Sequence, residues 1–172
     1  MQTRNVFAGP YLERASHMRT DLAWFDGALA DAASRVVPVW NSRNLIAGAD
    51  APRALLLGVE EIPAASRNSA ELILLGRYGG AHLFAYEITG AEPPAAPDGA
   101  RFEDLRLAAA LMPDEEAGVL SYARAMIGWR RTHRYCGACG SRTLPDRGGH
   151  RSHGVEGFAK PSRWREKAPI PQ

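Results

Sequence analysis

Hydrophobic residues recur at helical spacing in two parts of the chain. The first part covers residues 20–33, where apolar side chains stand three or four positions apart, which is typical of one buried helix face. Thr20 is the expected N-cap, and Asp21 is placed at the positive end of the helix dipole. The pattern therefore predicts a helix whose buried face carries Leu22, Phe25, Leu29 and Ala32.

The second helical pattern is longer and is expected to begin near Pro113. Proline suits a first helical turn, and the three acidic residues that follow it stabilise the positive end of the dipole. Basic residues crowd the expected C-terminal end, where positive charge is favoured. One face of this helix should carry Val119, Ala123, Met126, Ile127 and Arg130.

Short extended segments are predicted between the two helices, at residues 36–40, 45–46, 54–59, 72–75 and 81–88. The last two should form a hairpin around a turn at Tyr78, Gly79 and Gly80. In that hairpin Leu83 and Ala85 should face one side of the sheet. The other side should carry His82, Phe84, Tyr86 and Ile88. A loop is expected at residues 89–100, whereas 101–111 is ambiguous between strand and helix. The fold class is α+β.

The composition is that of an ordinary soluble protein, with 45% hydrophobic and 23% charged residues. No apolar run approaches the roughly 20 residues that span a bilayer, and no secretory signal is recognisable at the start. We therefore expect a cytoplasmic protein without a membrane partner. The charge is uneven: residues 1–129 contain 11 Lys and Arg against 16 Asp and Glu, whereas residues 130–172 contain 10 against 3. The basic part can attract phosphates or stay solvated.

The two cysteines of the chain, Cys136 and Cys139, lie in one C-x-x-C motif flanked by glycines. Such a knuckle suits tetrahedral zinc, and a redox pair is disfavoured because a helix precedes it and a glycine-rich loop follows. His150 and His153 are the candidate remaining ligands of a Cys2His2 site. The alternative is a vestigial knuckle beside two solvated histidines.

No catalytic motif is found. The fragment Glu115-Glu116-Ala117-Gly118-Val119 matches the end of a Nudix box, the glutamate-rich helix that holds magnesium against a pyrophosphate. Its upstream positions carry no Arg and Glu, and Pro113 would interrupt the required helix. We interpret the glutamates as helix N-terminal charges and assign no catalytic residue.

Two stretches resemble bacterial NADH pyrophosphatases of the Nudix superfamily. The run FAGPYLERASHMRTDLAWFDGALADAASRVVPVWNSRNLI, residues 7–46, is similar to their N-terminal domain. The run RFEDLRLAAALMPDEEAGVLSYARAMIGWRRTHRYCGACGSRTLPDRGGH, residues 101–150, is similar to their next helix and the first half of their zinc ribbon. With a weaker middle part, the resemblance spans about residues 5–156.

The resemblance implies a Nudix-like β-sheet domain with flanking helices at 1–112, a connecting helix at 113–134 and a partial, degenerate zinc ribbon at 135–158. The composition of residues 159–172 predicts a disordered basic tail. The resemblance also implies Cys136 and Cys139 as zinc ligands and Arg106 as a substrate contact. The family cleaves the pyrophosphate of NADH, NAD and capped RNA ends, often as a homodimer. Its Mg²⁺ or Mn²⁺ is held by a catalytic Nudix domain after the ribbon; no such site is found in this sequence.

Two departures from the family change the expected activity. The second cysteine pair of the ribbon falls on Gly154 and Gly157, and the segment FAKPSRWREKAPIPQ has no counterpart in the family. We therefore expect a non-catalytic, truncated paralogue that forms a homodimer or pairs with a full-length homologue, with a dinucleotide rather than nucleic acid as ligand. The alternatives are a nucleotide- or RNA-binding regulatory module and a small zinc-binding protein.

Overall fold

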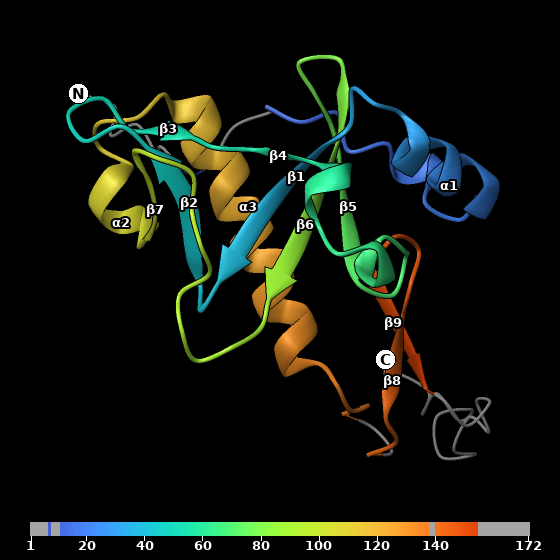
Figure 1. Ribbon diagram of the computed structural model, residues 1–172. Coiled ribbons are helices and arrows are strands. Elements are labelled where there is room, and N and C mark those ends of the chain that lie inside the picture. The colour runs from blue at the N-terminus through green and yellow to red at the C-terminus, as the bar shows by residue number, and fades with distance from the viewer. Residues whose placement is uncertain (1–6, 8–10, 138–139, 155–172) are drawn as a thin grey trace, which may run out of the picture.

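The computed structural model describes residue 7, residues 11–137 and residues 140–154 (Figure 1). Short 3-10 turns lie at Ser16–Met18, Val59–Glu61 and Ala64–Ser66. The helices are α1 (Leu22–Ala30), α2 (Leu105–Ala108) and α3 (Asp114–Thr132). The strands are β1 (Arg35–Trp40), β2 (Arg43–Ala47), β3 (Arg53–Ala54), β4 (Leu57–Gly58), β5 (Leu72–Tyr78), β6 (Ala81–Ile88), β7 (Ala100–Glu103), β8 (Thr143–Asp146) and β9 (Arg151–Gly154).

The first seven strands form one mixed sheet in the order β3-β2-β1-β6-β5, with β4 beside β1 and β7 beside β2. β1 and β6 run parallel and the other pairs run antiparallel. The turn between β1 and β2 consists of Asn41 and Ser42, whose φ angles are 46° and 61°. Two consecutive positive φ angles are the signature of the mirror-image turns that match the twist of a hairpin.

The chain thus combines helices with a mixed sheet, and the predicted α+β class is confirmed.

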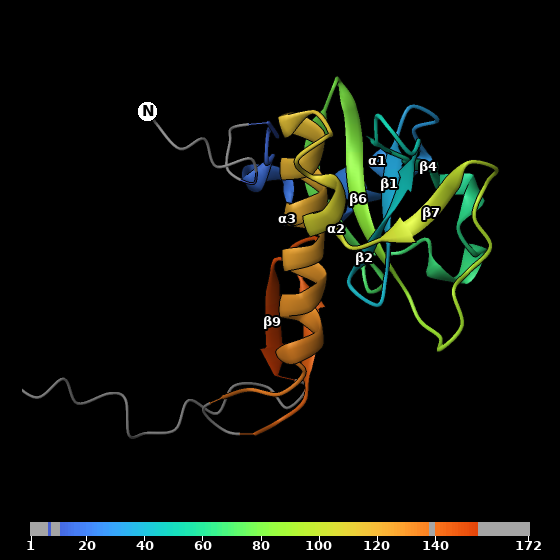
Figure 2. The same ribbon diagram turned by 90° about the vertical axis from the view of Figure 1, so that its left-hand side faces the viewer.

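Helices cover both faces of this sheet (Figure 2). On one face α3 buries Ala117, Val119, Leu120, Ala123 and Ile127 against strand residues that include Val37, Ile73, Leu83 and Ala85. On the other face α1 packs Phe25 and Ala28 against Val36, Leu72, Leu74 and Phe84. The predicted hairpin of β5 and β6 is confirmed, and its two sets of side chains enter these two separate cores.

The first helix differs from its prediction at the N-terminus. The assignment of Thr20 as N-cap is wrong, because the Asp21 side chain accepts the hydrogen bond from the Trp24 amide at 3.0 Å. Leu22 was expected on the buried face but is 68% exposed. Helical spacing alone cannot show how wide a stripe the sheet covers, and here it covers only the centre of the helix.

The long helix agrees with its pattern. Pro113 occupies the N-cap position, the first turn is acidic and the last turn carries Arg130 and Arg131. Residues 113–134 were expected as a connecting helix, and the observed α3 contributes its apolar face to the core of the sheet domain. Strong periodicity made this element predictable, since the buried face follows directly from the 3.6-residue repeat.

Two other segments resolve differently from their predictions. Residues 54–59 do not form one strand: β3 and β4 are short, and a 3-10 turn begins at Val59. The ambiguous segment 101–111 is both elements in succession, with β7 followed by α2. Asp104 separates them, because its side chain accepts the Arg106 amide and caps the helix.

The β8–β9 hairpin was not predicted from the sequence. Its residues are polar and glycine-rich, so they lack the alternating apolar pattern of a strand. The hairpin turn docks on β5: the Leu74 amide donates to Gly148 O at 2.9 Å, and His150 Nε2 lies 2.5 Å from Leu74 O. The expected disordered tail, 159–172, lies outside the described residues. Within the described part of the chain, no helix has the length and apolarity to cross a membrane.

Candidate functional site

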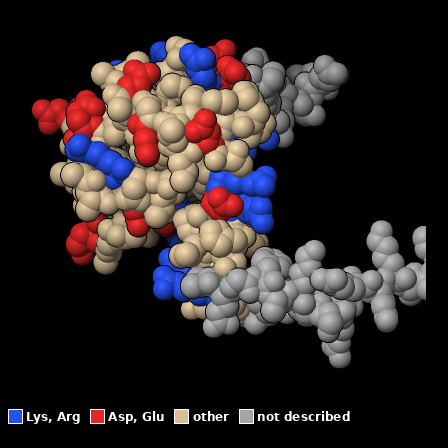
Figure 3. Space-filling view, turned by 90° about the vertical axis from the view of Figure 1, so that its right-hand side faces the viewer, with Lys and Arg blue, Asp and Glu red and all other residues tan. Residues whose placement is uncertain are grey.

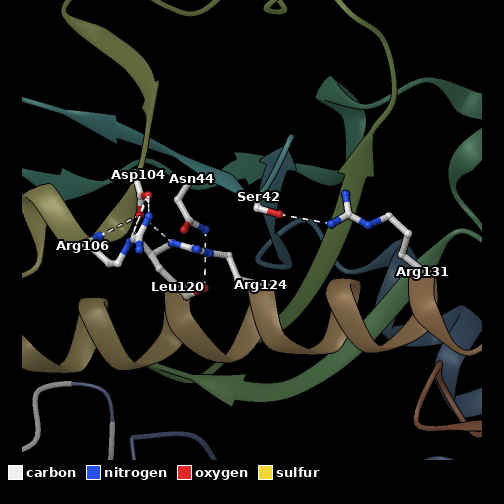
Figure 4. A network of polar contacts seen from close by, with 7 residues as sticks. All are labelled: Ser42, Asn44, Asp104, Arg106, Leu120, Arg124 and Arg131. Atoms are coloured by element: carbon white, nitrogen blue, oxygen red, sulfur yellow. Dashed lines mark hydrogen bonds and ion pairs between the residues drawn. The ribbon is translucent and has the colours of Figure 1, made fainter.

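The site around Arg106 lies where α2, α3 and the β1–β2 turn meet (Figure 4). Asp104 caps α2 and accepts hydrogen bonds from Arg106 Nε at 3.1 Å and Nη2 at 2.6 Å through Oδ2. Arg124 of the next helix, α3, donates from Nη1 to Asp104 Oδ1 at 3.1 Å. Two guanidinium groups therefore share one carboxylate.

Arg106 and Arg124 border a shallow cavity of about 350 Å³. Its remaining lining comes from the β1–β2 turn, from α3 and from Phe7. Ser42 is held in place by its positive-φ turn and accepts a hydrogen bond from Arg131 Nη2 at 3.4 Å. The cavity thus has polar walls from α2, α3 and the β1–β2 turn, and the turn is far from the two helices in the sequence.

The electrostatics of this site favour an anion. Hydrogen bonds from Arg106 hold the pKa of Asp104 well below its usual range, so this carboxylate stays ionised at neutral pH. One carboxylate cannot neutralise both Arg106 and Arg124, so one positive charge remains. The Arg106 side chain is 79% exposed, which leaves it accessible to a phosphate or carboxylate of a ligand.

Asn44 is a polar residue of this region that the sequence reasoning missed. It is fully buried on β2, and its Nδ2 reaches Leu120 O only at 3.5 Å. Its Oδ1 has no hydrogen-bond partner within the described part of the chain. Asn44 stands in a short strand pattern, where burial of a single polar side chain leaves no sequence signal.

The metal candidates fall partly outside the described residues. Cys139 is one of the undescribed positions. Cys136 is half-buried in a closed turn, where its carbonyl accepts the Gly140 amide and its own amide donates to Ser141 O, both at 2.8 Å. Zinc binding stays a prediction.

The two candidate histidines have different environments. His150 Nε2 is engaged by Leu74 O, and burial lowers the pKa of this imidazole. His153 Nδ1 is buried and has no hydrogen-bond partner within the described residues. Over the described ranges, no three His, Cys, Asp or Glu side chains gather in a way that could hold a metal ion. The Cys2His2 assignment therefore remains untested, since one of its four ligands is not described.

The acidic start of α3 has a definite structural role. Glu116 is only 8% exposed, and its two oxygens accept Arg53 Nε and the Ala54 amide, both at 2.7 Å. The Arg53 Nη2 also pairs with Glu116 Oε1 at 2.5 Å. Glu116 thus ties α3 to β3, while its neighbour Glu115 is exposed.

Comparison with known proteins identifies the family of this domain. Residues 33–129 match the family of NADH pyrophosphatase-like rudimentary NUDIX domains. The chain belongs to this family. The match runs from the loop before β1 to the last turns of α3, so it includes both the Asp104 site and the Glu116 contact. The resemblance to the Nudix superfamily inferred from the sequence is confirmed.

A curated relative of this NUDIX-like chain is the NAD-capped RNA hydrolase NudC of Deinococcus radiodurans. The two are 32% identical over 97 residues, which is 56% of this chain and 33% of the relative. The chain therefore matches about a third of the length of that hydrolase. The β8–β9 hairpin lies beyond the part matched by the family.

Proposed function

We propose that these 172 residues act as a non-hydrolytic NUDIX-like module. The module recognises a phosphate group of a dinucleotide and does not cleave the dinucleotide. The observation that carries this proposal is the contact of Glu116 with Arg53 and Ala54. Glu116 is half of the Glu-Glu pair that matches the end of a Nudix box, and both of its oxygens are used within the protein.

Nudix chemistry needs several carboxylates on one helix, because Mg²⁺ requires oxygen ligands to bridge it to the phosphates. A metal ion at Glu116 would have to displace a guanidinium at 2.5 Å and a backbone amide. Loss of those partners would leave the Ala54 N–H unsatisfied, at a cost of about 1–3 kcal/mol. Metal binding at this position is therefore opposed by the fold.

Recognition is supported by the Asp104 site. Arg106 is exposed beside a polar cavity and retains N–H donors that Asp104 does not use. The relative from Deinococcus radiodurans is named for hydrolysis of NAD-capped RNA, whose cap contains a pyrophosphate. A guanidinium that contacts such a phosphate would add affinity without any part in bond cleavage.

The hydrolysis assay is the direct test. Purified chain is incubated with NADH and Mg²⁺ or Mn²⁺, and the release of AMP and reduced nicotinamide mononucleotide is measured by chromatography. We expect no release above a metal-free control, while the Deinococcus radiodurans relative, assayed in parallel, should show turnover. Metal-dependent release by this chain above the metal-free control would overturn the proposal.

The recognition half of the proposal has its own test. Binding of NADH is measured by calorimetry for the unchanged protein, Arg106→Gln and Arg147→Gln. Arg147 is an exposed arginine in the β8–β9 turn, away from the cavity, so its change removes the same charge elsewhere. We expect Arg106→Gln to weaken binding roughly tenfold, as for loss of one charged hydrogen bond, and the control to bind normally. Equal affinities for the two variants would contradict a contact at Arg106.

A further inference from the structure

A second basic site lies at the C-terminal end of α3. The helix end, the ends of β5 and β6 and the start of β8 enclose a cleft of about 380 Å³. Glu116 and Arg131 are 15 residues apart on α3, which is roughly 22 Å along a helix. The cleft is therefore separate from the Glu116 contact, and it lies largely outside the segment matched by the family.

The lining of this cleft is positively charged, and its four arginines all come from the basic part of the chain, residues 130–172. Four arginines line it against two glutamates: Arg130, Arg131, Arg134 and Arg142 against Glu71 and Glu87. In Figure 3, which shows one face, Arg side chains lie around the narrower part of the molecule that carries the hairpin.

The four arginines are not equivalent. The Arg130 guanidinium is occupied within the protein, because it donates hydrogen bonds to the carbonyl oxygens of Ala70 and Glu71. Arg131 lies 3.9 Å from Glu87. Arg134 and Arg142 are exposed, and among the described residues neither guanidinium has an acidic partner. These two are the groups available to a ligand.

The backbone holds the end of α3, which carries Arg134 just beyond it, beside the residues that lead into β8, which include Arg142. The Thr143 amide donates to Arg134 O at 2.8 Å, and Thr143 Oγ1 donates to His133 O at 2.7 Å. An isolated bridge also joins Tyr135 to Arg142. The helix end and the first strand of the hairpin are thus clamped together, so both arginines are anchored at the mouth of one cleft.

The negative end of the helix dipole opposes an anion here, and two carbonyl groups near this end are engaged by the protein. Trp129 O accepts the His133 amide at 2.9 Å and lies 2.8 Å from His133 Nδ1. Thr132 Oγ1 donates to Gly128 O at 3.0 Å. The four arginines of the lining still outnumber its two glutamates.

We infer that this cleft binds a diphosphate group, held by Arg134 and Arg142 between the end of α3 and the β8 strand. A diphosphate offers two sets of oxygens, so each guanidinium can donate to a different phosphate. Ser152 also lines the cleft and can supply a neutral contact. The volume suits a small ligand, and the inference stands whether or not the protein hydrolyses NADH.

Calorimetric titration with inorganic pyrophosphate tests this site on the full chain. We expect saturable binding that weakens as salt is raised, with Arg134→Gln and Arg142→Gln each reducing affinity roughly five- to tenfold, as expected for a lost charged hydrogen bond. The matched control is Arg147→Gln, which removes the same charge from the hairpin turn, outside the cleft. It should change the affinity less than twofold by our estimate, roughly the scale of a screened surface charge.

Two results would overturn the inference. One is the absence of pyrophosphate binding at low salt. The other is an equal loss of affinity in Arg142→Gln and the Arg147 control, which would mean that diffuse positive charge attracts the ligand. Thermal unfolding of each variant shows whether it is folded, and Arg142→Lys should retain part of the affinity because it retains the charge. ADP and AMP serve as competitors: displacement by ADP and weak displacement by AMP is the expected order for a site that recognises two phosphates.

Discussion

Glu116 in the first turn of α3 accepts a hydrogen bond from Arg53 Nε of β3 at 2.7 Å. The sequence places these residues far apart, in an acidic helix start and a short strand. Their contact joins the helix to the sheet at one end of the core. It also explains why a Glu-Glu pair that matches part of a Nudix box serves the fold.

Glu116→Ala should destabilise the protein by about 2 kcal/mol, because the half-buried Ala54 amide loses its charged acceptor. Urea unfolding followed by circular dichroism measures the change. Glu115→Ala is the matched control, since Glu115 is exposed one position earlier on the same helix turn. A free energy of unfolding that is equally insensitive to both substitutions would show that the contact is not structural.

Asp104→Asn should lower stability at neutral pH and have a smaller effect in acid. Arg106 depresses the pKa of Asp104 in the folded state, whereas the unfolded value is about 3.9. The stabilisation is therefore present above about pH 4 and is lost as the pH falls toward the folded value. Asparagine is also a good N-cap, so the substitution removes the ion pairs and keeps the cap. Thermal unfolding at pH 6 and pH 3 gives the comparison, and a pH-independent difference between the two proteins would contradict the assignment.

Docking of the β8–β9 hairpin should weaken as the pH falls below about 6.5, the ordinary value for histidine. Burial lowers the pKa of His150, and the nearby Arg14 and Arg19 act in the same direction. The unfolded state therefore takes up the proton first, and the stability present at higher pH is lost in acid. Hydrogen exchange of the Leu74 amide reports docking directly, because this amide donates to Gly148 O. In His150→Gln the exchange, corrected for its intrinsic rate, should no longer change between pH 7 and pH 5; retained pH dependence would point to another group.

Gly149→Ala should detach the hairpin turn from β5. Gly149 has a φ of +83°, and an added Cβ would lie 3.0 Å from Ile73 Cγ1. Backbone strain and crowding together should cost roughly 1–3 kcal/mol. Gly128→Ala is the control, because its Cβ would meet no atom within 4 Å and alanine favours a helix. Equal stability of the two variants would mean that the turn is not packed on Ile73.

Periodic segments could be predicted because their pattern repeats over many residues. α3 and the β5–β6 hairpin agree with their predictions, and Leu83 and Phe84 enter opposite cores as alternation requires. The N-cap of α1 could not be predicted from the residue types. Asp21 and Thr20 are both good caps, and only the folded backbone shows which one accepts the amide of Trp24. The β8–β9 hairpin has no apolar alternation, so its strands left no local signal.

The sequence by itself determined the family, the α+β class and the uneven charge, because these depend on composition and on short-range order along the chain. The tertiary structure decided which charged groups meet. It joined Glu116 to Arg53, Arg106 and Arg124 to Asp104, and brought Arg142 beside Arg134. Such pairings depend on strand register and on how α3 crosses the sheet, and neither is fixed by the residues next to each partner in the sequence.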